Sequence, residues 1–268
     1  MAARGAVVSN PALLTVEGLT MRFGGLTALD DVGFNVERGT IFSVIGPNGS
    51  GKSTAFNCIS GVYRPTAGTV RFEGKRISGM APHRIARLGI ARTFQNIELF
   101  RSESTIDNLM LGRHQHMKTG LWRGVAMVNG LTSAAREERT NRAHVHEIIE
   151  LMDLGAVRDR PVGELPYGTQ KRVELGRAIA MEPKLLLVDE PSAGMNAEER
   201  AEVATGLRRL QRELGLTILL IEHHLGLAID LADRALALNF GRAIALGTPQ
   251  EVRKHPDVIR AYLGDGPR

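Results

Sequence analysis

The chain has a single cysteine, Cys58, among its 268 residues. One cysteine excludes an internal disulfide framework and is compatible with a reducing compartment. The longest apolar runs, 184–188 and 217–221, are far too short to cross a bilayer, because a spanning helix needs about 20 residues. The N-terminus lacks the apolar core of an export signal. We therefore expect a protein that is neither exported nor embedded in a membrane.

Aromatic residues and net charge are also scarce. Phe, Trp and Tyr make up 4% of the chain, and the net charge is +5. The composition is that of an ordinary globular protein that is long enough to bury a sizeable core. The mild excess of arginine is not gathered in a tail, so it permits contact with lipid headgroups or nucleic acid but argues for neither. A solvated basic surface explains it best.

The apolar pattern predicts an α/β domain over 13–268, behind a loose leader at 1–12. The opening part alternates polar and apolar residues, which is typical of antiparallel strands. A helical pattern follows and predicts an inserted subdomain near 96–182. From residue 185 strands alternate with helices, among them a helix near Ala197–Leu214, which indicates a parallel sheet with crossover helices. A helical extension at 249–268 closes the chain.

One glycine-rich stretch matches the phosphate-binding loop, G-x-x-x-x-G-K-[ST]. It follows the β-rich run Ile41–Ile45 and precedes a predicted helix. Glycines let backbone N–H groups turn inward as an anion nest, and the helix N-terminus adds positive charge. The lysine would reach the β- and γ-phosphates of a nucleoside triphosphate, and the following serine would ligate Mg²⁺. The expected binding residues are Gly46, Pro47, Asn48, Gly49, Ser50, Gly51, Lys52, Ser53 and Thr54.

Two carboxylates end the apolar strand Leu185–Val188. Strand side chains alternate, so Asp189 and Glu190 point in different directions and can have separate roles. Asp189 would orient Mg²⁺, and Glu190 would polarise the attacking water as general base. The alternative is a pair of acids that simply meet solvent at a strand end.

Histidines give a weaker signal. His223 follows another predicted strand of the parallel sheet, where ligands of open α/β sheets collect, so it could reach the γ-phosphate. A strand-end histidine can equally be incidental. Pairs at 114/116 and 144/146 invite a metal site, but no cysteine cluster or His-Glu-x-x-His spacing supports one. We expect these four to be exposed helical histidines.

The ordered set of motifs closely resembles the ATP-binding subunits of ABC transporters, from Leu13 to the C-terminus. Within that family the chain looks most similar to the branched-chain amino-acid importer type. That resemblance rests on the sequence 89–95 followed by Leu99-Phe100, the long insert after 112–114, Ile221-Glu-His-His224 and the ending 247–264. The phosphate loop alone would not be this specific.

The resemblance implies further roles. Phe23 occupies the place of an aromatic that stacks on adenine, although its sequence context alone indicates core packing. Gln95 matches a glutamine that touches Mg²⁺ and the attacking water, and His223 matches the histidine on the γ-phosphate. A five-residue segment stands where the family has its signature, Leu-Ser-Gly-Gly-Gln, and would contact the ATP of the opposite subunit. Its residues are Leu165, Pro166, Tyr167, Gly168 and Thr169.

The signature is also where this sequence departs from the family pattern. Pro166 replaces the serine and removes a hydroxyl and a backbone N–H, while Tyr167 and Thr169 replace glycine and glutamine. Asn196 stands where the usual aspartate would be. Losing one charge-assisted donor costs roughly 1.5–3 kcal/mol, which slows a site about tenfold or more. We expect a weakened site and not a lost one.

The sequence therefore predicts an α/β fold with a P-loop NTPase core, a parallel sheet, an antiparallel β flank and an inserted α-helical subdomain. The resemblance implies an ATPase that uses ATP and Mg²⁺ and works as a homo- or heterodimer with a second ABC ATPase subunit. Permease subunits and, indirectly, a substrate-binding protein would be its partners at the cytoplasmic face of the inner membrane, and no nucleic acid is expected.

Three other functions stay open from the sequence alone. They are an importer of urea or other amides, a weakly hydrolysing regulatory subunit, and an ABC ATPase that acts on DNA or ribosomes. An ATPase of the last kind usually carries a coiled coil, a zinc site or a duplicated cassette, and none of these is visible in the sequence. The insert at 112–135 contains an apolar stretch with the sole tryptophan, at 121–128, which is either a partner contact or a small core of its own.

Overall fold

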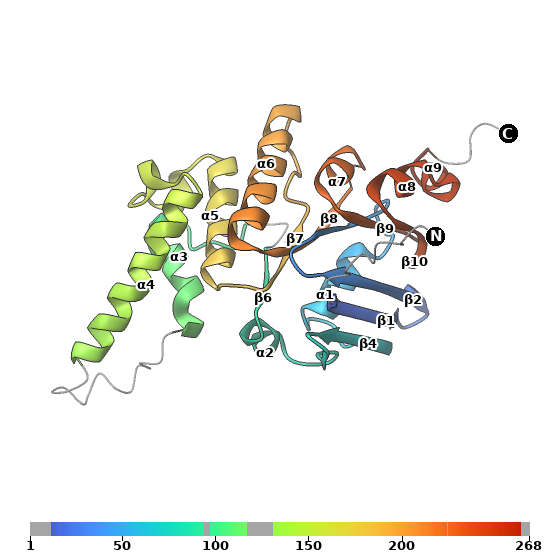
Figure 1. The fold of residues 1–268 in the computed structure, drawn as a ribbon, viewed down its shortest axis with the longest axis horizontal. Coiled ribbons are helices and arrows are strands. Elements are labelled where there is room, and N and C mark those ends of the chain that lie inside the picture. Colours follow the sequence, from blue (N-terminus) through green and yellow to red (C-terminus); the bar gives the residue numbers. More distant parts are fainter. Residues whose placement is uncertain (1–11, 94–96, 117–130, 224, 264–268) are drawn as a thin grey trace, which may run out of the picture. The chain divides into compact units, whose positions relative to one another are not determined.

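Figure 1 shows the fold in a computed structural model, which describes residues 12–93, 97–116, 131–223 and 225–263. The chain divides into two compact units, one made of residues 1–88 and 187–268 and the other of residues 89–186. The helical segment predicted near 96–182 falls within the second unit. The leader predicted at 1–12 lies outside the described residues apart from Ala12, which begins the first strand.

A four-stranded antiparallel sheet forms the β flank of the first unit. Its order is β2-β1-β4-β5. In β2 the side chains of Val32, Phe34 and Val36 are buried and their neighbours are not, which is the alternation expected of a sheet with one covered face. The antiparallel flank predicted from the sequence is confirmed. The strands are β1 (Ala12–Phe23), β2 (Leu26–Glu37), β4 (Ala67–Phe72) and β5 (Lys75–Arg76).

The larger sheet of the first unit has the order β10-β9-β3-β8-β7. Strand β3 runs parallel to both β8 and β9, with Ile45 opposite Glu222 on one side and Ala237 on the other. Parallel neighbours end at the same edge, so the loop after β3 emerges beside the residues that follow β8 and β9. The strands are β3 (Ile41–Ile45), β7 (Leu185–Asp189), β8 (Thr217–Glu222), β9 (Arg234–Asn239) and β10 (Arg242–Gly247).

Helix α6 of the first unit has clear local signals at its start and its end. The structure gives α6 the bounds Ala197–Leu214, as the sequence predicts. Asn196 caps it in a capping box with Glu199, and Gly215 ends it at φ 62°, a left-handed conformation that glycine adopts readily. The others are α1 (Lys52–Ile59), α2 (Pro82–Arg87), α7 (Leu225–Leu231), α8 (Pro249–Lys254) and α9 (Pro256–Leu263).

The single cysteine lies on α1 and is buried. Burial raises the pKa of the Cys58 thiol to about 11, so it stays protonated near neutral pH and is a poor nucleophile. Cys58 therefore packs the helix that follows the phosphate loop.

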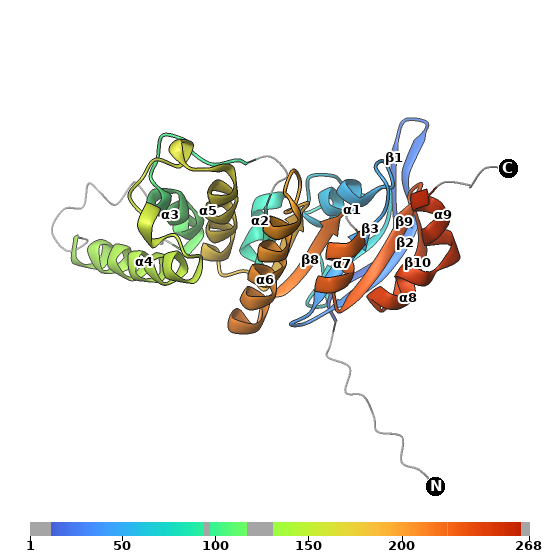
Figure 2. The ribbon, with the colours of Figure 1, turned by 90° about the horizontal axis from the view of Figure 1, so that it is seen from above.

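The second unit is mostly helical, and Figures 1 and 2 both show α3, α4 and α5 side by side. Gly112 of α3 permits this close packing, because a Cβ there would lie 2.4 Å from the carbonyl oxygen of Arg177 on α5. The buried Arg113 donates to Asn141 Oδ1 at 2.9 Å and to Ala180 O at 3.0 Å, which ties α3 to α4 and α5. The elements are β6 (Ile90–Arg92), α3 (Thr105–Arg113), η1 (His114–His116), α4 (Leu131–Leu151), η3 (Gly155–Val157), η4 (Val162–Glu164) and α5 (Tyr167–Ala180).

Across the described parts of both units, no helix combines the length and the apolar character that crossing a membrane requires.

Candidate nucleotide-binding site

The loop after β3 has glycine where no other residue fits. A Cβ at Gly46 would lie 2.2 Å from the carbonyl oxygen of Leu238, and one at Gly51 would lie 2.6 Å from that of Ala28. Gly51 also has φ 104° and is the N-cap of α1. The backbone can therefore turn tightly against the neighbouring strands, which is the geometry that a nest of N–H donors needs.

Lys52 is the first residue of α1, and its side chain folds back across this loop. Its ammonium donates to Gly46 O at 2.7 Å and to Pro47 O at 2.9 Å. An ammonium has three donor hydrogens, so one remains for an anion. Burial lowers the pKa of Lys52, while the carboxylates of Glu190, Asp189 and Glu222 raise it. Lys52 is thus fixed over the loop, close to the acids that were predicted to share its site.

The other polar groups of the loop differ in access. Asn48, Gly49 and Ser53 are exposed, and Thr54 is half-buried. Ser50 is buried, and its carbonyl oxygen accepts a hydrogen bond of 3.0 Å from the N–H of Gly241, in the turn between β9 and β10. The loop is therefore held from the side by a neighbouring hairpin, while its tip and the Ser53 hydroxyl remain accessible to a ligand.

Asp189 and Glu190 stand where β7 ends. Asp189 is buried, and the N–H of Glu190 donates to Ile221 O at 3.0 Å. Glu190 has φ 45°, which a non-glycine residue adopts only when its surroundings hold it there, and such residues cluster at functional sites. Its Oε2 lies 3.8 Å from His223 Nδ1. The structure thus brings Lys52, Asp189, Glu190 and His223 together, as the sequence predicts.

One pair of residues at this edge was not foreseen. Glu222, fully buried at the end of β8, accepts hydrogen bonds from Ser192 Oγ at 2.8 Å and from Ser192 N at 3.3 Å. Ser192 is also fully buried, so the pair ties the loop after Glu190 to the strand end before His223. The available signal was an acidic residue at the end of the otherwise apolar strand 217–221.

The sequence context of Phe23 alone indicated a core residue, but the structure shows that Phe23 is not buried in the core. Its side chain is 42% exposed at the end of β1, and its ring meets that of Tyr63 edge-on, with centroids 5.2 Å apart. Two adjoining aromatic rings can provide a stacking surface for a base. Sequence reasoning missed Tyr63, because nothing in the local pattern pairs it with a residue 40 positions earlier.

The signature segment belongs to the second unit, where it leads into α5. Leu165 is buried, and Pro166 is the N-cap of α5, so the helix begins at Tyr167. Gln170 fixes the turn by donating to Leu165 O at 2.7 Å. Pro166, Tyr167 and Gly168 are exposed, and Thr169 is half-buried. The first N–H groups of α5 therefore face outward, and proline at the cap removes only a donor that the helix does not use.

Two predicted features lie outside the described residues. One is Gln95, expected at the metal and the attacking water. The other is the apolar stretch at 121–128, expected to be either a partner contact or a small core.

The histidines of the pairs 114/116 and 144/146 are only partly as predicted. His114 and His146 are exposed. His116 and His144 are instead half-buried, because they fill positions between helices: His116 lies 3.0 Å from a backbone carbonyl, and His144 lies 3.2 Å from a carboxylate oxygen of Glu182. Within the described ranges, no group of three or more histidine, cysteine or acidic side chains could hold a metal ion.

Comparisons with known proteins identify the family of the chain. The family model for ABC transporters matches residues 29–193, and one described as a branched-chain amino acid ATP-binding cassette transporter matches residues 244–267. The chain is 41% identical to the high-affinity branched-chain amino acid transport ATP-binding protein BraF of Pseudomonas aeruginosa, over 94% of this chain and 98% of that protein. It is 42% identical to LivG of Escherichia coli K12, which bears the same description, with the same coverage.

Among solved structures, an ATP-binding cassette of an ABC transporter in its ADP conformation superposes with a TM-score of 0.81 at 30% identity, over 95% of this chain and 99% of that one. The fold predicted from the sequence is thereby confirmed. The transporter model alone covers more than half of the 268 residues, and the curated relatives align along nearly their whole length. The chain belongs to the ABC transporter family and is one of its ATP-hydrolysing subunits.

Proposed function

We propose that this ATPase energises the import of branched-chain or chemically related amino acids. The observation that carries the proposal is the similarity to BraF and LivG, both described as transport ATP-binding proteins for these amino acids, over 98% of their length. The match at residues 244–267 supports it, because that family is defined for branched-chain amino acid cassettes and covers the C-terminal helices. The ATPase would work on the cytoplasmic face of the inner membrane, against permease subunits that receive cargo from a binding protein.

The strand-end cluster suits in-line hydrolysis of ATP. Loop N–H groups and Lys52 would hold the β- and γ-phosphates. A water oxygen would then attack the γ-phosphorus as the bond to the bridging oxygen breaks, and Glu190 would take the proton of the water. His223, 3.8 Å from Glu190, would orient the γ-phosphate and the water. Phe23, with Tyr63 beside it, would stack on the adenine.

The donors of the site also fit Mg²⁺. The ion prefers hard oxygen ligands, and the site offers the carboxylate of Asp189 and the exposed hydroxyl of Ser53. We assign these two residues, together with Gln95, as its protein ligands. When bound, Mg²⁺ would supply positive charge that neutralises the charge developing on the phosphates in the transition state.

The signature segment would complete a site on another subunit. Helix N-termini bind phosphate through free N–H groups and the helix dipole, and the start of α5 is exposed. We propose that residues 165–169 contact ATP held by the phosphate loop of a second ABC ATPase, so that two subunits enclose two nucleotides. With Pro166 in place of serine, the partner's site would lose one hydroxyl contact.

Copurification tests the proposed cargo. The tagged chain should bring down permease subunits, a second ATPase and, through the permease, a substrate-binding protein. The ligand profile of that binding protein should show leucine, isoleucine or valine among its tightest ligands. A profile restricted to urea or simple amides would overturn the branched-chain assignment while leaving the ATPase assignment intact.

A weakly hydrolysing regulatory subunit is the second candidate, and the departures at Pro166 and Asn196 favour it. In the structure Asn196 caps α6, a role that asparagine performs as well as aspartate. Phosphate release, measured for the chain alone and within the assembled complex, decides between the two. Turnover that stays near background in the complex would support the regulatory role.

A further inference from the structure

The C-terminal helix α9 is packed against the strand that carries the phosphate loop. Val258 of α9 is fully buried in a cluster with Ile45, the last residue of β3, and with Ala237 of β9. Tyr262, one turn further along α9, packs on the same cluster. Tyr262 therefore packs against the cluster that contains the last residue before the loop at Gly46.

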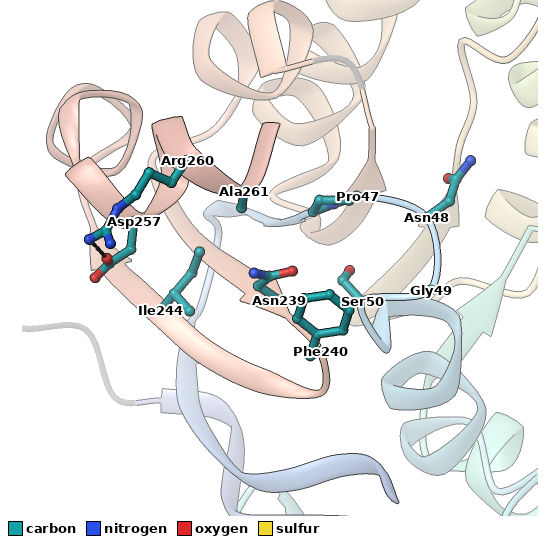
Figure 3. Close-up of a pocket in the computed structure, with 10 residues that line it drawn as sticks. All are labelled: Pro47, Asn48, Gly49, Ser50, Asn239, Phe240, Ile244, Asp257, Arg260 and Ala261. Carbon is teal, nitrogen blue, oxygen red and sulfur yellow. Dashed lines mark hydrogen bonds and ion pairs between the residues drawn. The ribbon is translucent and has the colours of Figure 1, made fainter. Parts of the chain in front are cut away.

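Figure 3 shows residues of α9 and of the phosphate loop around one pocket. Loop residues 47–50 line the same pocket, of about 460 Å³, as Asp257, Arg260 and Ala261 of α9. Asn239 at the end of β9, Phe240 in the turn that follows and Ile244 of β10 complete the wall. The C-terminal helix and the phosphate loop are thus near neighbours, although they are about 200 positions apart in the sequence.

The hydroxyl of Tyr262 has the backbone of Gly46 as a neighbour. Burial raises the pKa of Tyr262 to about 12, a backbone contact with Gly46 lowers it, and the Glu222 carboxylate raises it. The oxygen is buried, and no described residue gives it a hydrogen bond of full geometry. The contact with Gly46 is therefore a weak one in this conformation.

A second hydroxyl beside Gly46 is in the same condition. Ser50 Oγ is buried and also lacks a partner in the described parts of the chain. It is close to Gly46, since a Cβ there would lie 2.6 Å from it. Unsatisfied buried hydroxyls lower stability, and natural proteins seldom keep them without a reason. Two of them beside one loop glycine leave acceptors that a shift of the loop could satisfy.

We propose that Tyr262 is a positioning residue for the phosphate loop: its ring anchors α9 against the end of β3, and its hydroxyl accepts the Gly46 N–H when the loop closes on nucleotide. If packing alone were required, phenylalanine would fill the space without a buried polar atom. Through Tyr262, the C-terminal segment sets the affinity of the loop for ATP without touching the nucleotide. The inference rests on ATP binding by the chain, and titration of the wild-type protein with ATP and Mg²⁺ measures that binding independently.

The test compares Tyr262→Phe, Tyr262→Ala and a control, Ile259→Ala, in the full chain. Ile259 lies on the same helix, but its side chain is 44% exposed. Each protein is titrated with ATP and Mg²⁺ by calorimetry and melted without nucleotide. Hydrogen exchange of the loop peptide is followed with and without ATP.

Removing the hydroxyl alone should separate binding from stability. Tyr262→Phe should keep or raise the nucleotide-free Tm, because it deletes an unsatisfied polar atom, and should weaken ATP binding about three- to tenfold. Its loop should exchange faster than wild type only when ATP is present. Tyr262→Ala should lower both Tm and affinity, and Ile259→Ala should change neither.

A structural role without positioning gives a different pattern. An ATP affinity of Tyr262→Phe within twofold of wild type would overturn the proposal, whatever happens to the Tm. A fall in Tm that accounts for the weaker binding would overturn it too. Failure of the wild-type protein to bind ATP would contradict the ATPase assignment itself, and the inference with it.

Discussion

The phosphate loop and the signature segment both precede a helix that offers its N-terminus to a phosphate, yet they are built differently. In the loop, Gly46 and Gly51 are required by nearby backbone atoms, and Lys52 is buried against the loop's own carbonyls. In the signature, Tyr167 is 52% exposed and a Cβ at Gly168 would meet nothing within 4 Å. The fold of the chain dictates the residues of the first segment and leaves those of the second free. We infer that what docks on the signature decides its residues, which explains why this chain departs from its family there.

The largest expected effect comes from the strand-end site beside the phosphate loop. Glu190→Gln keeps the shape of the side chain but removes the base, so hydrolysis should fall about 10²- to 10⁴-fold while ATP binding persists. The variant should accumulate a closed dimer with ATP, visible by size-exclusion chromatography. Glu198→Gln, an exposed residue in the first turn of α6, is the matched control and should hydrolyse ATP at the wild-type rate. Normal phosphate release by Glu190→Gln would remove Glu190 as the base.

Lys52→Ala should have the next largest effect, and it acts on binding. Each charge-assisted contact to phosphate contributes about 1.5–3 kcal/mol, so losing the ammonium should raise the Kd for ATP on the order of a hundredfold. Calorimetric titration measures it, with Lys75→Ala, an exposed lysine of β5, as the control. An unchanged Kd would show that the loop is not the phosphate cradle and would break the comparison with the signature.

Stability should distinguish the buried strand end beside the phosphate loop from an exposed position. Ser192→Ala leaves the buried carboxylate of Glu222 without its 2.8 Å donor, which should lower the free energy of unfolding by about 1–3 kcal/mol. Urea denaturation measures this, and Ser102→Ala, at an exposed position, should stay within about 0.5 kcal/mol of wild type. If both serine variants unfold alike, the strand-end site is not the self-stabilised structure described above.

The same contrast explains how much could be predicted from the sequence. Strands, helices and the loop carry local signals, so the bounds of α6 and the group of Lys52, Asp189 and Glu190 could be predicted from the residues, while the role of His223 was implied by the family resemblance. Contacts between distant segments carry none. Tyr63 beside Phe23 and Ser192 against Glu222 arise from tertiary packing, in which the partners are 40 and 30 positions apart. These pairings required the structure.

Tyr262 against the loop shows this limit most clearly. The sequence indicated a helical extension at 249–268, and the helices α8 and α9 lie there. No spacing in the sequence connects a residue of that extension with Gly46. The parallel register ends β3 and β9 at one edge of the sheet. Helix α9 packs on the residues at that edge, so the phosphate loop is its neighbour.

The smallest expected effect is at the exposed signature segment. Pro166→Ser restores the family's hydroxyl and backbone N–H at the cap of α5, and serine is a good N-cap, so the fold should tolerate it or gain up to about 1 kcal/mol. Hydrolysis by the complex with the partner ATPase should rise severalfold, and by no more than about tenfold, because one phosphate contact returns. The chain at concentrations where it stays monomeric should show no gain, since the signature would act on the nucleotide of a second subunit. Pro82→Ser, at an exposed helix start in the first unit, should leave turnover unchanged. A gain by the monomeric chain would place the signature at the chain's own site and contradict the contrast between the two segments.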